Sequence, residues 1–157
     1  MKDAYSGIVN LVFIALFLLV ISCVLGLIVS YTKAFKMKNN VISVIERYEG
    51  SGCTCTDTSG TCTGVSTECR KRIVQGAKRI GYAPVNINCP ANYDNVDNLY
   101  CVKKIFSRGS DGSHYARYTY DVVTQVDINF SLVSKIFGFN VFKISGKTQE
   151  VEMPTSK

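Results

Sequence analysis

The chain has 157 residues, with 18 Lys and Arg against 12 Asp and Glu, so its formal net charge at pH 7 is +6. This length holds one domain and excludes a large multidomain enzyme. Tryptophan is absent and histidine occurs once, which excludes chemistry that depends on paired histidines. Seven cysteines in so short a chain are the strongest signal in the composition, and they predict either disulfides or a metal site.

An apolar segment from Ile8 to Tyr31, IVNLVFIALFLLVISCVLGLIVSY, carries no charge. As an α-helix it is about 36 Å long, enough to cross a hydrocarbon core of about 30 Å with some tilt. A cleaved secretory signal is the alternative, because Lys2 precedes the segment and residues 32–34 loosely resemble a small-residue cleavage site. The apolar cores of such signals are only about 7 to 15 residues long, so the segment predicts a single-pass transmembrane anchor.

Within this span, three small residues recur every four positions: Ser22, Gly26 and Ser30. They lie on one face of a helix, where small side chains let a second transmembrane helix approach closely. Chance is the other explanation, because Ser and Gly are common in such spans. The pattern predicts a helix-packing face, and Cys23 beside it is interpreted as a small apolar packing residue.

The sequence gives conflicting indications of membrane orientation. Lys33, Lys36 and Lys38 follow the span, whereas Lys2 and Asp3 cancel before it, so the positive-inside rule favours a cytoplasmic C-terminal part. The cysteines favour the opposite side, because dense cysteines are typical of exported, oxidised domains. The six that lie beyond the span are Cys53, Cys55, Cys62, Cys69, Cys89 and Cys101. We therefore expect an extracytoplasmic C-terminal part.

Zinc binding is the competing use of these six cysteines. No CxxC pair is present to supply two thiolates to one tetrahedral ion, and the one histidine, His114, is far from the cluster in sequence. The spacing therefore favours structural disulfides and leaves their connectivity open. Cys53 and Cys55 are too close in sequence to pair with each other, so we expect each to bond to a different cysteine.

The helical pattern continues beyond Tyr31 into polar sequence. Apolar residues recur at steps of three and four, while charged and polar residues occupy the other faces. The apolar set is Ala34, Met37, Val41, Val44 or Ile45, and Tyr48. A continuous helix from Ile8 to Tyr48 is therefore predicted, about 60 Å long, with its first half in lipid and its second half amphipathic in water. Gly50-Ser51-Gly52 is predicted to end it.

Residues 53–64 are small, polar and rich in cysteine, and they predict a stapled loop. Ser66 or Thr67 then offers an N-cap for a short helix that stops at Gly81. Its apolar stripe consists of Cys69, Ile73, Val74, Ala77 and Ile80. Its other faces carry a basic patch of Arg70, Lys71, Arg72, Lys78 and Arg79. Such a patch is most often a solvated face, and it can also contact anionic lipid, wall polymer or an acidic subunit.

Strand patterns follow the Pro- and Asn-rich stretch at residues 84–98. Residues 99–106 predict one strand, and residues 108–113 have the chemistry of a turn. From Ala116 to Phe130 apolar and polar residues alternate, which predicts one long strand with one buried face. A third, less regular strand is expected between Asn140 and Glu152.

This order of elements predicts an α+β fold. A long N-terminal helix, transmembrane and then amphipathic, is followed by a short helix and a small antiparallel β-sheet. The sheet is expected to pack on the second helix or on the water-exposed half of the first. We divide the chain into an anchor with its helical extension, residues 1–50, and a cysteine-rich extracytoplasmic head, residues 51–157.

No recognised catalytic motif is present in the sequence. A nucleophile elbow, a Walker loop, HExxH and GxGxxG are all absent. Catalysis would depend on His114 with Asp111 or Asp121, and a histidine beside a polar turn is far more often an exposed hairpin residue. Asn129 begins an N-glycosylation triplet that matters only in a eukaryote. We expect no enzyme activity, no cofactor, no metal, no small-molecule substrate and no nucleic-acid partner.

The layout of the chain resembles the TadE-like pseudopilins of tight-adherence pilus systems. The residues that carry the resemblance are the N-terminal span, residues 31–50, which end in Glu46-Arg47-Tyr48-Glu49-Gly50, and the terminal sheet at residues 118–152. The resemblance implies hydrophobic helices that pack together in a membrane platform or filament, and an exported head. It also implies cleavage by a prepilin peptidase after a glycine, here Gly7. The pilin pattern expects Glu five residues later, where this chain has Val12, and a minor, anchored member fits that departure better.

These features predict a non-catalytic, single-pass component of a pilus or secretion assembly in the cell membrane. Its N-terminal helix is expected to dock among similar helices, and its disulfide-stapled head is expected to be displayed outside the cytoplasm. The expected partners are membrane lipid and other pilin-like or pseudopilin subunits. A membrane-anchored binding module is the alternative, in which the basic helix contacts an anionic polymer or an acidic partner.

Overall fold

The computed structural model describes residues 2–55, 61–62, 67–84, 87–109, 115–127 and 141–154. Within these ranges two helices and six strands follow one another. They are α1 (Lys2–Arg47), β1 (Thr61–Cys62), α2 (Glu68–Ile80), β2 (Asp94–Val96), β3 (Tyr100–Gly109), β4 (Tyr115–Asp127), β5 (Val141–Lys147) and β6 (Val151–Pro154). This is the α+β order that the sequence predicts.

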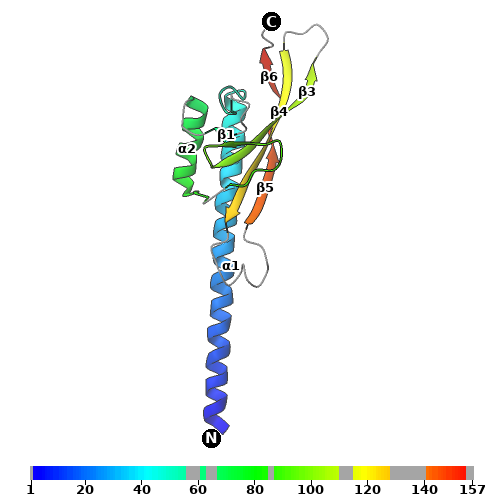
Figure 1. Ribbon diagram of the computed structural model, residues 1–157. Coiled ribbons are helices and arrows are strands. Elements are labelled where there is room, and N and C mark those ends of the chain that lie inside the picture. The colour runs from blue at the N-terminus through cyan, green and yellow to red at the C-terminus, as the bar shows by residue number, and fades with distance from the viewer. Residues whose placement is uncertain are drawn as a thin grey trace.

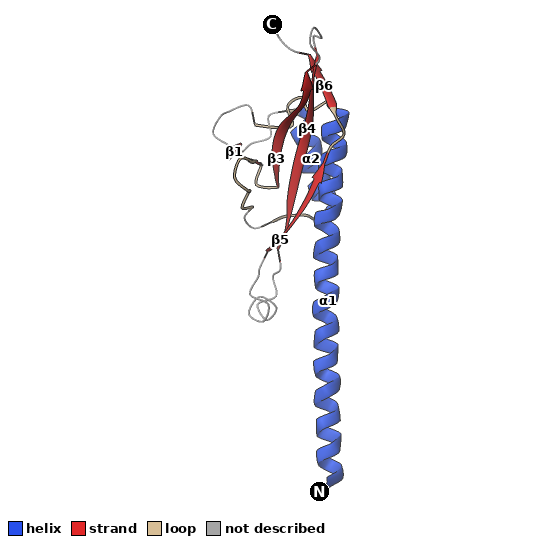
Figure 2. Ribbon diagram, turned by 90° about the vertical axis from the view of Figure 1, so that its right-hand side faces the viewer, coloured by secondary structure: helices blue, strands red, loops and turns tan. Residues whose placement is uncertain are grey.

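Helix α1 is one unbroken helix of 46 residues, and its N-terminal part projects away from the rest of the molecule (Figures 1 and 2). The predicted continuity is confirmed, although the helix begins earlier than Ile8 and ends one residue before Tyr48. No Gly or Pro occurs between Leu27 and Glu49 to interrupt the hydrogen-bond ladder. Beyond the helix Gly50 adopts a φ angle of 72°, and its amide donates to the carbonyl of Ile45 at 2.8 Å.

The C-terminal part of α1 belongs to the core of the molecule. Its fully buried side chains are Ala34, Met37, Val41 and Ile45. They share one hydrophobic core with residues of α2 and of the sheet. The predicted apolar stripe is therefore confirmed, and the head packs around α1 well before the boundary that we placed at residue 50. Below, residues 7–33 are called the free half of α1 and residues 34–47 its buried half.

Helix α2 begins and ends at the predicted caps. The hydroxyl of Thr67 accepts a hydrogen bond from the amide of Arg70, and Gly81 ends the helix in the left-handed conformation with φ of 68°. The helix packs against α1, where Gly76 allows a close approach because a Cβ at this position would collide with the side chain of Asn40. The buried residues of α2 are Cys69, Arg70, Ile73 and Ala77.

The strands form one sheet in the order β1-β2-β3-β4-β5, with β6 also paired to β4. All pairs are antiparallel except the short β1–β2 pair. Strands β5 and β6 follow the same edge of β4. The register changes by one residue between them, because Lys147 pairs with Asp121 whereas Val151 pairs with Tyr118. The third strand expected between residues 140 and 152 is thus two strands separated by a bulge.

The sheet packs on the buried half of α1, and α2 lies beside the same part of α1 (Figure 1). On this face of β4, Tyr120 and Val122 are fully buried. The hydroxyl of Thr124 donates to the backbone carbonyl of Ala34 at 3.1 Å. Of the two packing partners expected for the sheet, the first helix is therefore the main one.

The opposite face of β4 is also covered toward the C-terminal end of the strand. Val123 and Gln125 are buried there, and Val123 packs with Ile87 and Cys101 in a second, smaller core. The prediction of a single buried face is wrong for this part of the strand. The reason is a distant chain segment, which contributes Ile87 and covers a face that the alternation alone assigns to solvent.

Candidate functional site

The free half of α1 is the largest exposed apolar surface among the described residues. Its large apolar side chains from Ile8 to Tyr31, with the exception of the half-buried Leu27, are between 39% and 68% exposed. One helix in the described part of the chain, Gly7–Arg47, is long and apolar enough to cross a membrane. Together with the disulfides described below, this helix is compatible with a membrane-anchored domain outside the cytoplasm.

The junction between the free and buried halves of α1 contains no linker. Lys33 is exposed and the next residue, Ala34, is completely buried, and the helix continues through both without a break. A helix that is continuous through such a junction fixes the orientation of the head relative to the span. A glycine- or proline-rich linker at this point would instead let the head reorient.

The predicted helix-packing face lies on the free half. Ser22 is exposed, and its hydroxyl donates to the carbonyl of Leu18 at 2.8 Å, so that it is satisfied within its own helix. Gly26 and Ser30 are half-buried. Cys23, next to Ser22, is the free cysteine among the described residues. The small side chains of this face would let a second helix approach closely, and the Ser22 hydroxyl needs no partner from that helix. Contact with another helix at this face stays a prediction.

Two aromatic residues and a lysine form a group where the span meets the head, and the sequence was not expected to bring these three side chains together. The rings of Tyr31 and Phe35 stack with their centroids 6.4 Å apart, and Lys38 places its ammonium 4.3 Å from the centre of the Phe35 ring. Aromatic rings commonly occur at the membrane–water boundary. The sequence did offer a signal for this contact, because side chains four residues apart are neighbours on the surface of a helix.

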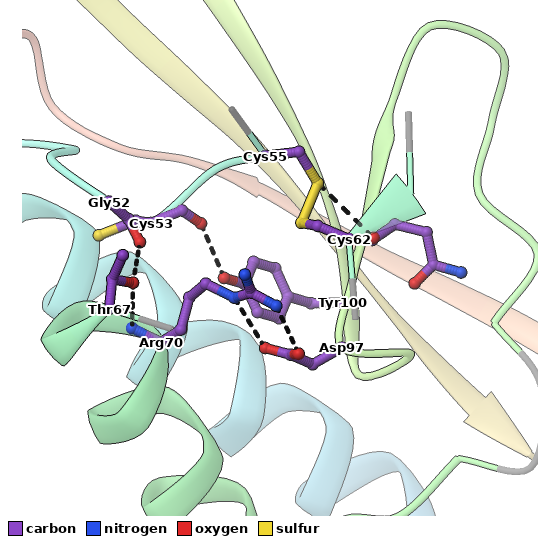
Figure 3. Close-up of a disulfide and its surroundings, with 9 residues drawn as sticks. Gly52, Cys53, Cys55, Cys62, Thr67, Arg70, Asp97 and Tyr100 are labelled. Atoms are coloured by element: carbon purple, nitrogen blue, oxygen red, sulfur yellow. Dashed lines mark hydrogen bonds and ion pairs between the residues drawn. A yellow bond between two sulfur atoms is a disulfide. The ribbon is translucent and has the colours of Figure 1, made fainter. Parts of the chain in front are cut away.

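The structure separates Arg70 from the rest of the predicted basic patch. Its side chain is only 6% exposed, and its guanidinium bonds to both carboxylate oxygens of Asp97, at 2.6 Å from Nη2 and 3.0 Å from Nε (Figure 3). This hydrogen bonding raises the pKa of Arg70 above its already high usual value. The residues of the patch that are exposed are Lys71, Arg72, Lys78 and Arg79. The prediction is thus wrong for Arg70, because its acidic partner lies 27 residues away in sequence.

The backbone around Asp97 holds this carboxylate in place. Asp97 and Asn98 have positive φ angles of 51° and 56° in the turn between β2 and β3, and the amide of Asp97 donates to the carbonyl of Cys62 at 2.8 Å. Nearby, the hydroxyl of Tyr100 donates to the carbonyl of Cys53 at 2.9 Å, and burial raises the pKa of Tyr100 (Figure 3). The ion pair is therefore part of a buried polar group that joins α2, the β2–β3 turn and the segments around two disulfides.

All six cysteines beyond the span form disulfides, as predicted. The bridges are Cys53–Cys69, Cys55–Cys62 and Cys89–Cys101. The first joins the segment after α1 to the first turn of α2. The second joins Cys55 to β1, and the third joins the segment before β2 to β3, on the face of the sheet that is opposite α1. The two cysteines that are closest in sequence do reach different partners.

Among the described residues, no group of three or more His, Cys, Asp or Glu side chains is arranged to hold a metal ion. Asp121 is half-buried and accepts a hydrogen bond from the hydroxyl of Tyr93 at 2.8 Å, which raises the pKa of Tyr93. This contact gives Asp121 a structural partner. His114, Asp111 and Asn129 lie outside the described residues.

The predicted processing position, Gly7, lies within α1, with open space around the position of a Cβ. Val12, which stands where the pilin pattern expects Glu, is 55% exposed on the surface of the helix. Its apolar side chain suits a lipid environment, in which a carboxylate would be costly without a partner. Cleavage after Gly7 stays a prediction.

No family model, curated protein or solved structure matches this chain. The resemblance to TadE-like pseudopilins therefore rests on the sequence layout. Three features of the molecule bear on its function: the free half of α1, the unbroken junction of this half with the head, and the disulfide-bonded head itself.

Proposed function

We propose that this chain is a non-catalytic, single-pass subunit of a pilus-like or secretion assembly, with its head outside the cytoplasm. The observation that carries the proposal is the continuity of α1 from its free half into the core of the molecule. Lateral docking of free halves in the membrane would fix the spacing and orientation of the attached heads. A tethered binding module has no need of such rigidity, which is why we favour an assembly subunit.

The specific form of this proposal is a minor, anchored member of the TadE-like pseudopilins. The sequence layout supports it, with a span, an amphipathic continuation of the same helix and a terminal sheet. Val12 at the position of the expected Glu supports a minor member over a polymerising one. The anchor would remain in the membrane and contact similar helices through the face of Ser22, Gly26 and Ser30.

The disulfides support an extracytoplasmic head. Reducing systems of the cytosol keep protein thiols reduced, so three bridges that staple one small head are typical of an exported protein. Lys33, Lys36 and Lys38 oppose this orientation through the positive-inside rule, which describes a statistical bias of loops. We give more weight to the bridges, because they are covalent features of the folded head.

Thiol labelling of intact cells tests the orientation. We expect a membrane-impermeant maleimide to leave the six cysteines of the head unmodified until an impermeant reductant is added, and to label them afterwards. Cys23 lies in the span and should resist the reagent in both conditions. Labelling of the six thiols only after the cells are permeabilised, without any reductant, would overturn the proposed orientation.

Replacing Gly26 by Leu is expected to reduce self-association of the full-length protein in membranes severalfold. A leucine side chain at this position keeps a second helix from approaching closely. Val24→Leu is the matched control, because it adds side-chain volume on the opposite face of the helix. The measurement is chemical crosslinking in liposomes at a fixed protein-to-lipid ratio. Equal crosslinking of the wild type and both variants would show that this face makes no contact.

A further inference from the structure

A groove with a volume of about 440 Å³ lies between α1 and the C-terminal end of α2. Its apolar wall includes Ile28 and Val29 from the free half of α1 and Ile80 from the last turn of α2. Its basic wall includes Lys33, Lys36 and Arg79. On α1, the apolar residues Ile28 and Val29 thus lie on the side of the span, and the basic residues Lys33 and Lys36 lie on the side of the head.

The fold brings the basic end of α2 down to this level. Helix α2 runs antiparallel to α1. The Cys53–Cys69 disulfide ties the first turn of α2 to the segment that follows α1, and the last residues of α2 lie beside the beginning of the buried half of α1. The ammonium of Lys33 is 3.8 Å from the position that a Cβ on Gly81 would occupy, directly after α2. Two segments that are distant in sequence therefore build one site.

Among the described residues, no neighbouring acid neutralises the positive charges of the groove. Lys33, Lys36 and Arg79 are exposed, and none of them forms an ion pair with another described residue. None of the described lining residues is acidic. Along the two helices the nearest acidic residues, Glu46 and Glu68, are each about 15 Å from the basic wall at 1.5 Å per residue. The groove is therefore complementary to an anion.

The groove lies at the expected height of the lipid headgroups. If the span ends at Tyr31, Lys33 and Lys36 lie about 3 and 8 Å beyond it along the helix. The headgroup layer on each side of a bilayer is about 5 to 8 Å thick. Ile28 and Val29 then lie at the edge of the hydrocarbon core. From the core outward, the groove presents apolar and then basic side chains, in the order in which a phospholipid presents its acyl chains and its phosphate.

We infer that this groove binds an anionic phospholipid of the leaflet next to the head. The phosphate lies between Lys33, Lys36 and Arg79, and the beginning of an acyl chain lies against Ile28 and Val29. The inference rests on the membrane anchoring in the proposed function, and it is independent of lateral assembly. Lipid binding would give Lys33 and Lys36 a role on the exported side of the membrane, where the positive-inside rule does not expect lysines.

The test uses the full-length protein in nanodiscs of phosphatidylcholine, with or without phosphatidylglycerol. The groove variant combines Lys33→Gln, Lys36→Gln and Arg79→Gln. The control variant combines Lys71→Gln, Arg72→Gln and Lys147→Gln, which removes the same charge from exposed positions outside the groove. Circular dichroism verifies that both variants fold. The readout is the lipid that remains bound in native mass spectrometry after the protein is transferred to detergent.

We expect the wild type and the control variant to retain phosphatidylglycerol in preference to phosphatidylcholine. The groove variant should lose this preference, by about a hundredfold if each basic residue contributes as it does near an anionic surface. Excess soluble glycerol phosphate should not displace the lipid, because it lacks the acyl chains that contact the apolar wall.

Several results would overturn the inference. They are equal retention of the two lipids by the wild type, equal loss of the preference in both variants, and displacement by glycerol phosphate. Loss of crosslinking between copies in the groove variant, with lipid retention unchanged, would identify the groove as a subunit contact instead. Failure of the wild type to enter nanodiscs would overturn the anchoring itself, whereas insertion without lipid preference would overturn this inference alone.

Discussion

Replacing Asp97 by Ala is expected to lower the free energy of unfolding of the head by about 3 to 5 kcal/mol. The substitution leaves the guanidinium of Arg70 without its carboxylate partner at a site where the two side chains are only 6% and 8% exposed. Arginine keeps its proton at any ordinary pH, so the unpaired guanidinium cannot escape this penalty by becoming neutral. The backbone turn between β2 and β3 also loses the side chain that anchors it to α2.

Urea unfolding of the full-length protein in detergent, followed by circular dichroism, measures this loss. Glu68→Ala is the matched control, since Glu68 faces Arg72 across 3.7 Å with both side chains more than half exposed. It should cost less than about 1 kcal/mol. The double variant Arg70→Met with Asp97→Leu should be more stable than Asp97→Ala, because it leaves no unpaired charge. A loss in Asp97→Ala no larger than that of the control would contradict the burial of the pair.

Removing the Cys53–Cys69 bridge by alanine substitution of both cysteines is expected to lower the stability of the head by about 3 kcal/mol. The bridge spans a sequence separation of 16 residues, and it constrains the unfolded chain accordingly. Its two cysteines are at most 1% exposed and belong to the main hydrophobic core, so their removal also leaves unfilled space. This bridge also ties the beginning of α2 to the segment after α1.

The Cys55–Cys62 bridge provides the comparison for this experiment. It spans a separation of 7 residues, its cysteines are half-buried, and its removal should cost about 2 kcal/mol. Thermal unfolding of the two double variants under the same conditions gives the difference. Cys23→Ala should leave the transition unchanged, because the free cysteine lies in the span. A larger loss for the short bridge than for the long one would contradict the order that the structure predicts.

Local patterns in the sequence were sufficient to predict most elements of the fold. The uncharged segment and the stripe that follows it predicted one long helix, because the spacing of apolar residues along a helix is a local property. Thr67 and Gly81 marked the ends of α2, since capping depends on residues within one turn. The density of cysteines predicted disulfides in the head. These features also sufficed to propose an anchor, a rigid extension and a stapled head.

Contacts between distant segments decided the remaining features. From the sequence, Arg70 is one member of a basic helix face. In the fold it pairs with Asp97, and no local pattern predicts an acidic partner 27 residues away. The second face of β4 is buried because Ile87, from the segment between α2 and β2, packs against Val123. The groove at the membrane end of the head requires α1 and α2 to run antiparallel. Which helices and strands form could be predicted from the sequence alone, because that choice depends mainly on neighbouring residues. Which charged side chains are buried, and which line a site, followed only from the folded chain, because burial depends on the distant segments that pack against each side chain.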